Sequence, residues 1–358
     1  MNIESLKHPY KDSSETIEKF LDVDLSVNSL EMVSKDSVCD YEEFYENYEL
    51  KEVSSAILAI SYDGKGIPMT SKESEKIKGR EDNVESKKVR LGKGEKKQKK
   101  KEALAGVCYE TEAKYRTAED ISNNLVFGKT EVKEDKSPKG KNVRRMASIE
   151  KPKREIVEEI RKEAERRDPE HKSIWAIIMD GAPYLWLLVY AVFKGTNFIP
   201  ILDIIHVIEY LWDAGNALFG DKSSERQFWV HEKLVKILQG KVSKVIKELK
   251  DEARKKSIKG ANLKQVERSV KYFENHKKWM KYDQYLEKGL PIASGVVEST
   301  CGHLIKDRME LSGCKWNIQG AENILKLRSI KTSDNWDEYW KYHIAQQKIL
   351  LYDCKQVS

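Results

Sequence analysis

The sequence has few of the features that would place it in several large protein classes. It contains five cysteines in 358 residues and no C-x-x-C pair, so it shows neither a disulfide framework nor a standard zinc-finger pattern. The N-terminus has no basic-then-apolar signal pattern, and there is no P-loop and no internal repeat. A reducing cytosol is therefore the expected compartment.

Only one stretch is apolar over the length of a membrane span. It covers residues 174–193, IWAIIMDGAPYLWLLVYAVF. Asp180 lies inside it, where a charge at mid-membrane costs about 3 kcal/mol. Gly181 and Pro183 then interrupt the pattern. We therefore expect a buried strand, a turn and an apolar helix here, and no membrane association.

Charge is unevenly distributed along the chain. Residues 1–53 carry a net charge of −9, which leaves +15 for residues 54–358 of a chain whose net charge is +6. A basic body of this size favours a polyanionic partner, most commonly nucleic acid. The run KKVRLGKGEKKQKKK at 87–101 holds nine bases and one acid. It is interpreted either as a solvated loop or as a contact with the nucleic-acid backbone.

Strand and helix patterns alternate along the first part of the chain. Short apolar runs bounded by turn residues predict strands over 56–60, 103–110, 174–179 and 198–202. Helices are predicted over 153–167, 183–193 and from Ser223 to Gly240, within a block that is helical from 206 to about 278. This order predicts an α/β domain that carries an all-helical insertion.

Three acidic residues stand in apolar surroundings. Asp63 and Asp180 each end an apolar strand, and Glu298 lies on a helix within the sequence SGVVES. A buried carboxylate needs a cation, a set of hydrogen bonds or a metal, and carboxylate oxygens suit Mg²⁺ or Mn²⁺. Two such ions can activate the attacking oxygen and stabilise the leaving oxygen of a phosphoryl displacement. The alternative is that Asp63-Gly64 and Asp180-Gly181 are ordinary turns.

Four segments resemble a known family: SYDGKGIPM, MDGAPYLW, ILDIIHVIEYLW and GLPIASGVVESTCGHLIKDRMELSGCKW. They are similar to ISKra-type insertion-sequence transposases over roughly residues 55–345, most specifically at 290–316. The resemblance implies a ribonuclease H-like mixed sheet of order 3-2-1-4-5, flanked by helices. It also implies a catalytic triad, Asp63, Asp180 and Glu298, which holds two Mg²⁺ or Mn²⁺ ions and cleaves and transfers DNA strands at the ends of the element.

The pattern and the resemblance together predict how the chain is organised. An acidic segment at 1–53 precedes the first part of the core at 54–205, a helical insertion at 206–288 and the last part of the core at 289–358. The implied partners are the DNA of the element ends and of the target, and a second copy of the chain in a homodimer or larger complex. The implied location is the cytoplasm of a prokaryote, on the nucleoid.

Asp203 competes with Asp180 for the place of the second acid, because both end an apolar strand. In the implied sheet Asp180 follows the strand beside that of Asp63, whereas Asp203 follows the next strand outward. We therefore expect Asp180 to bind metal and Asp203 to begin a helix or support the acids. Asp203-x-x-His206 matches a signature of the Mutator-like and hAT-like groups, so His206 is either a core histidine or a residue beside the acids.

Several other residues are candidates for contacts. Arg308, Lys315 and Trp316 are expected to contact DNA, the tryptophan by stacking on an unpaired base. Trp212 and Trp229 are expected to pack in the core of the helical block. Cys301, His303 and Cys314 fit no standard zinc spacing, and we expect them to pack around the catalytic helix.

Two departures from the family pattern open an alternative. Ala293 stands where a glycine is expected in the turn before Glu298, and only residues 1–53 precede the first strand. Family members usually carry a DNA-end reader in that region. The alternative function is therefore a truncated, non-catalytic remnant that still binds DNA.

Overall fold

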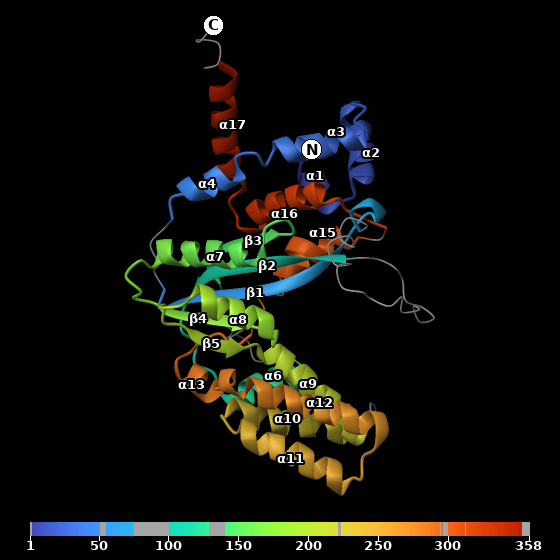
Figure 1. Cartoon of the computed structure of the whole chain (residues 1–358), viewed down its shortest axis with the longest axis vertical. Coiled ribbons are helices and arrows are strands. Elements are labelled where there is room, and N and C mark those ends of the chain that lie inside the picture. The colour runs from blue at the N-terminus through green and yellow to red at the C-terminus, as the bar shows by residue number, and fades with distance from the viewer. Residues whose placement is uncertain are drawn as a thin grey trace, which may run out of the picture.

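The computed structural model describes residues 2–50, 55–74, 100–128, 140–220, 223–293, 295, 300–311 and 313–352. They form an α/β structure in which a five-stranded mixed sheet is flanked by helices. Figure 1 shows the sheet in the middle, with the first and last helices of the chain at one end and a block of helices at the other. The α/β class expected from the sequence is confirmed.

The sheet combines antiparallel and parallel pairs. Its order is β3-β2-β1-β4-β5, which agrees with the order that the family resemblance implies. The first three strands are antiparallel neighbours, whereas β4 runs parallel to β1 and β5 runs parallel to β4. The strands are β1 Ile57–Pro68, β2 Lys100–Thr111, β3 Lys141–Ser148, β4 Ile174–Met179 and β5 Ile199–Leu202.

β1 is longer than its apolar run indicates. Its pairing with β4 ends at Tyr62, opposite Met179, but its pairing with β2 continues to Pro68, opposite Lys100. The sequence predicted that Asp63 ends the strand. In the structure Asp63 instead lies within β1. It stands where β1 loses its parallel neighbour while β2 still supplies backbone hydrogen bonds.

β3 is the strand that the sequence analysis missed. Three of its first five residues are basic, so no apolar run marks it. Arg144 on this strand is nevertheless buried, and its guanidinium lies 3.3 Å from the centroid of the Tyr45 ring. Tertiary packing thus covers a strand whose local sequence indicates an exposed segment.

Alternate residues of β2 face two different layers. A Cβ at Gly106 would lie 2.7 Å from Cγ1 of Ile160, so α7 (Lys153–Arg167) approaches closely on one face. Ala103 and Ala105 instead share a core with Leu304 and other residues of the C-terminal helices. α8 (Pro183–Val192) packs beside α7. The helices of the second layer include η2 (Cys301–Lys306), α15 (Asp307–Met309) and α16 (Ile318–Thr332).

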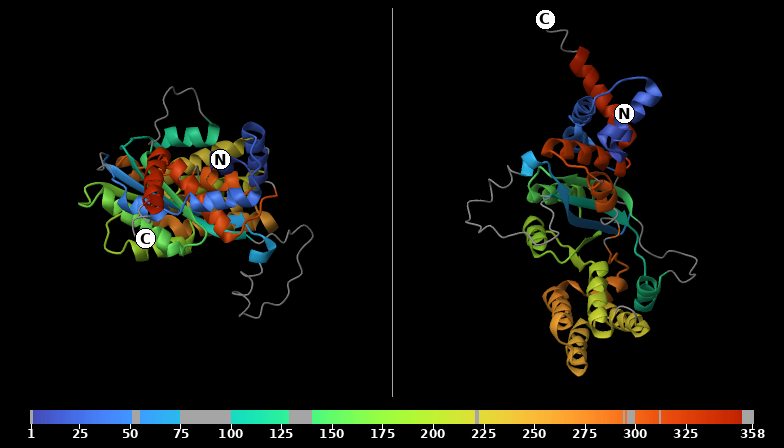
Figure 2. Two further views of the ribbon diagram at one scale, coloured as in Figure 1. Left: turned by 90° about the horizontal axis from the view of Figure 1, so that it is seen from above. Right: turned by 90° about the vertical axis from the view of Figure 1, so that its right-hand side faces the viewer.

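The acidic N-terminal segment folds into helices that cover this second layer. Arg328 of α16 donates to the carbonyl oxygens of Leu304 and Leu6, which ties the first helix to the C-terminal part of the chain. The views in Figures 1 and 2 place the first and last helices of the chain on the same side of the sheet. The helices are α1 Asn2–Lys7, α2 Tyr10–Leu21, α3 Val27–Asp36, α4 Tyr41–Asn47 and α17 Trp336–Tyr352.

A block of helices follows β5 directly. One buried lysine holds two of its helices together, because Lys233 forms ion pairs with Glu248 (2.7 Å) and Glu252 (2.8 Å). α6 (Ala118–Phe127) packs on α10. The block consists of α9 Ile204–Phe219, α10 Ser224–Leu238, α11 Val242–Lys255, α12 Gly260–His276, η1 Lys277–Trp279 and α13 Tyr282–Glu287.

The apolar stretch 174–193 folds as β4, a short loop and α8. In the part of the chain that the structure describes, no helix has both the length and the apolar character needed to cross a membrane.

Candidate active site

Three aspartates occupy equivalent positions on three neighbouring parallel segments: Asp63 lies within β1, and Asp180 and Asp203 directly follow β4 and β5. Tyr62 of β1 pairs with Met179 of β4, and Met179 in turn pairs with Leu202 of β5. The next residue after each is an aspartate: Asp63, Asp180 and Asp203. Because side chains at one register position of parallel strands share a face, we call these three residues the aspartate row.

Asp180 lies in a short loop that is fixed from two sides. Its Oδ1 accepts a hydrogen bond from the Ala182 N–H (3.0 Å), and its backbone carbonyl accepts one from the Trp186 indole (2.8 Å). Within the described chain, the second carboxylate oxygen accepts no hydrogen bond and no basic side chain pairs with it. The half-buried Asp180 side chain is thus held in position by one oxygen, while its other oxygen could bind a metal ion.

The helical block holds this loop from outside. The Nε2 of His276 lies 2.9 Å from the Gly181 carbonyl oxygen, and its Nδ1 lies 2.6 Å from the Tyr272 carbonyl oxygen. A Cβ at position 181 would lie 2.7 Å from Cε2 of Tyr272. Only glycine therefore fits here without moving the Tyr272 and His276 side chains of α12, which hold the Asp180 loop in position.

Asp203 is bound more tightly into the fold than Asp180. Its side chain is fully buried, and its Oδ1 accepts from the Ile205 N–H (2.9 Å), which caps the first turn of α9. Its backbone N–H donates to the Met179 carbonyl (2.8 Å). This is the helix-start role that the sequence analysis expects of Asp203.

His206 stands on the first turn of α9 among carboxylates. Its Nδ1 lies 3.1 Å from a carboxylate oxygen of Glu209, and its side chain is 37% exposed. Burial lowers the pKa of His206, but Asp203, Glu209 and Asp180 outweigh it and raise the pKa above its ordinary value. Of the two interpretations of His206, the structure favours a residue beside the acids over a core histidine.

Glu298 lies outside the described residues, but the structure describes the segment that follows it, residues 300–311. η2 packs against β1, and the Thr300 hydroxyl accepts a hydrogen bond from Nε of Arg145 on β3 (3.0 Å). Ala105, which pairs with Asp63, belongs to the same core as Leu304. The segment from Thr300 to Lys306 therefore packs on the face of β1 and β2 that carries Ala105.

The aspartate row is looser than a closed metal cage. Among the described residues, one group of three possible metal ligands has ligand atoms all within 4.8 Å of one another, and it is Cys39, Asp40 and His343. The carboxylate oxygens of the three aspartates in the row do not all lie within 4.8 Å of one another. Oxygen donors of this kind still suit Mg²⁺ or Mn²⁺, which keep several waters and need few protein ligands.

Two of the predicted DNA contacts need correction. Arg308 is 1% exposed and Trp316 is 5% exposed, so neither side chain is offered to DNA. The Arg308 guanidinium donates to the Ser5 carbonyl (2.8 Å) and lies 4.6 Å from the Trp316 ring centroid. The sequence analysis missed this because the N-terminal helices, far away in sequence, cover both residues. Lys315 is exposed, as a DNA contact requires.

The other candidates fall in different places. Trp229 is buried, and its indole N–H donates a hydrogen bond to Glu252 (2.5 Å). Trp212 is partly buried in the same core, so the predicted packing role of both tryptophans is confirmed. His303 is exposed and pairs with Asp307 (2.8 Å) rather than packing in the core. Of the basic run 87–101, residues 87–99 lie outside the described residues, while Lys100 begins β2 and pairs with Glu310 (2.5 Å).

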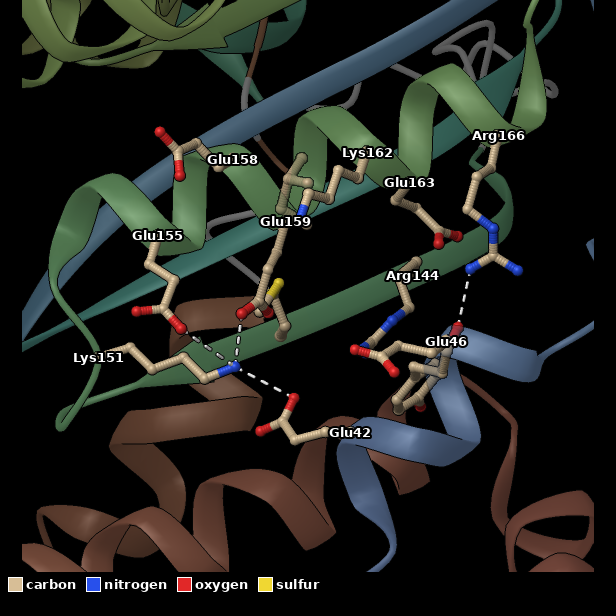
Figure 3. Close-up of a pocket in the computed structure, with 13 residues that line it drawn as sticks. Glu42, Glu46, Arg144, Lys151, Glu155, Glu158, Glu159, Lys162, Glu163 and Arg166 are labelled. Carbon is tan, nitrogen blue, oxygen red and sulfur yellow. Dashed lines mark hydrogen bonds and ion pairs between the residues drawn. The ribbon is translucent and has the colours of Figure 1, made fainter.

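A cavity of about 520 Å³ lies between α4, β3 and α7, and sequence reasoning gave no signal for it. In Figure 3, Lys151 points to three glutamates and Arg166 reaches α4. Burial lowers the pKa of Lys151, but Glu159 and Glu42 raise it above its ordinary value. Lys151 pairs with Glu42 of α4 and with Glu155 and Glu159 of α7, so the charged groups at this end of the cavity join α4 to α7. The cavity does not replace the aspartate row as the candidate site.

No protein-family model matches the chain, and no curated protein matches it. The function is therefore inferred from the row and its surroundings.

Proposed function

We propose that the protein is a DNA transposase of ribonuclease H-like fold, which cleaves and transfers DNA strands at the ends of an insertion sequence. One observation carries the proposal. Asp63 and Asp180 directly follow the last paired residues, Tyr62 and Met179, of the neighbouring parallel strands β1 and β4, in a sheet of order β3-β2-β1-β4-β5. Metal-dependent phosphoryl transfer needs ligands that hold the ions close together, and carboxylates at the ends of neighbouring strands can supply them.

The roles of the acids follow from their surroundings. Asp63, Asp180 and Glu298 would hold two Mg²⁺ or Mn²⁺ ions, which supply charge neutralisation for attack on a phosphodiester by water or by a DNA 3′-hydroxyl. The free oxygen of Asp180 and the rigid loop around it suit a ligand. Asp203, which caps α9, keeps that loop and His206 in place and does not itself bind the ion.

The remaining chain would bind and position DNA. Lys315 and the basic run 87–101 are the proposed contacts with phosphates, which fix DNA without reading its sequence. The proposed assembly is a homodimer or larger complex that joins element ends with target DNA, on the nucleoid of a prokaryotic cytoplasm.

The decisive experiment incubates the full chain with Mg²⁺ and DNA carrying the element's own ends. Wild-type protein should nick the strand at the element boundary. Glu298→Gln, which keeps shape but removes charge, should lower cleavage at least about 100-fold while DNA binding stays within a few-fold. Glu310→Gln is the matched control, because Glu310 pairs only with the surface group Lys100 among its described contacts. Cleavage by Glu298→Gln at near wild-type rate would contradict the assignment.

The alternative function, a non-catalytic DNA-binding remnant, has a distinct outcome in the same assay. The wild-type chain would then bind the DNA with the same affinity as the Glu298→Gln variant and would produce no nicks at any Mg²⁺ or Mn²⁺ concentration.

A further inference from the structure

Residues far apart in the sequence meet where the connection between α3 and α4 contacts α17. Cys39 and Asp40 come from the connection, and His343 and Gln347 lie one turn apart on the helix. The Nδ1 of His343 is 2.6 Å from Oδ2 of Asp40, and the Gln347 amide lies 3.4 Å from the Cys39 sulfur. The sulfur, carboxylate and imidazole ligand atoms all lie within 4.8 Å of one another.

This mixture of donors is selective for a type of metal. A thiolate, an imidazole and a carboxylate are ligands that Zn²⁺ takes, whereas Mg²⁺ prefers oxygen alone. With zinc bonds of about 2.0 to 2.3 Å, ligand atoms in a tetrahedron stand roughly 3.5 Å apart. The three ligand atoms need only a small adjustment to reach that spacing. In that adjustment the hydrogen bond between His343 and Asp40 is replaced by bonds from both side chains to the metal.

The surroundings already hold two of the ligands. The side chains of His343 and Asp40 are 11% and 12% exposed. The Tyr339 ring stacks on the imidazole at 5.9 Å and 11°, and its hydroxyl donates to the Ser37 carbonyl (2.9 Å). Cys39 is exposed and gives an entry path from solvent. Fixed ligands next to an accessible one are what a site that loads from solution requires.

We propose that Cys39, Asp40 and His343 bind a zinc ion that fastens the connection between α3 and α4 to α17. The fourth position is filled by water or by the Gln347 amide, turned so that its oxygen faces the ion. Burial, and then the neighbouring Asp40, raise the pKa of the Cys39 thiol, so the ion displaces a proton from the sulfur when it binds. This site is separate from the aspartate row and does not depend on the function proposed for that row.

The test is a titration of the full chain, freed of metal, with Co²⁺ followed by Zn²⁺. Wild-type protein should develop thiolate-to-Co²⁺ charge-transfer absorption that a single equivalent of Zn²⁺ removes. Cys39→Ser should lose this band and bind Zn²⁺ more than about tenfold more weakly. Cys314→Ser is the matched control and should behave as wild type. Absence of the band in the wild type, or an equal band in Cys39→Ser, would overturn the site.

A second measurement covers the case in which Cys39→Ser does not fold. Zn²⁺ should raise the thermal midpoint of the wild type and of Asp180→Asn, but not that of His343→Gln. A shift that persists in His343→Gln would overturn the proposal. Because Asp180→Asn disables only the other site, loss of DNA cleavage and loss of zinc binding are distinguished.

Discussion

Asp180 and Asp203 follow neighbouring parallel strands at equivalent positions, yet the protein uses them differently. After β4 the chain continues as Gly181-Ala182-Pro183, so Asp180 stands in a loop with one carboxylate oxygen free of described hydrogen bonds. After β5 a helix starts at once, and the buried Asp203 carboxylate caps it. The residues that follow a strand, and not the aspartate itself, decide whether the carboxylate is available to a ligand.

Matched substitutions give the strongest test of this difference. Asp180→Asn and Asp203→Asn both retain an oxygen for the hydrogen bond to the backbone N–H two residues later. We expect Asp180→Asn to lower DNA cleavage at least about 100-fold, and Asp203→Asn to lower it less than about tenfold. Cleavage rates at saturating Mg²⁺ measure both effects. The opposite order, with both proteins folded, would move the metal ligand to Asp203.

A smaller effect is expected where α12 holds the Asp180 loop. A Cβ at position 181 would lie 2.7 Å from Cε2 of Tyr272 and 2.9 Å from Nε2 of His276. Gly181→Ala should therefore shift the loop, lower cleavage by about 10- to 100-fold and reduce the free energy of unfolding by about 1–3 kcal/mol. Denaturant unfolding and the cleavage assay measure the two losses.

Gly302→Ala is the control for that substitution, since among the described residues no atom outside its own helix backbone lies within 4 Å of the added Cβ. If Gly181→Ala cleaved as fast as this control, the loop would not be set by α12.

The smallest effect concerns the charge of His206. Its pKa is raised above the ordinary value of 6.5, so the pairing of its cation with the carboxylates stabilises the fold fully below about pH 6.5. That contribution is lost as the pH rises through the raised pKa of the folded state. In metal-free protein, His206→Gln should remove this part of the pH dependence, a change under about 1 kcal/mol because the side chain is partly exposed. Unfolding at pH 6 and pH 8 measures it, and an unchanged difference would contradict the pairing.

Much of the sheet could be predicted because its inner strands carry local signals. β4 and β5 are short apolar runs closed by Asp180 and Asp203, and both were located within one residue. β3 could not be predicted, since its basic sequence is covered by helices that include α4 and α16, which lie about a hundred residues or more away in the sequence. The same cause explains Arg308 and Trp316, whose charge and aromatic ring indicated a surface that the N-terminal helices cover.

By itself, the sequence determined the features that depend on neighbouring residues: where the apolar strands run, where α7, α8 and α10 begin and end, and which carboxylates stand in apolar surroundings. Tertiary structure alone decided which strands are neighbours, that Asp63, Asp180 and Asp203 share one row, and that Cys39 and Asp40 meet His343. The pairing of β1 with β4 and the contact of Asp40 with His343 join segments separated by a hundred or more residues. Such pairing is selected by the packing of the whole core, and no local pattern of residues encodes it.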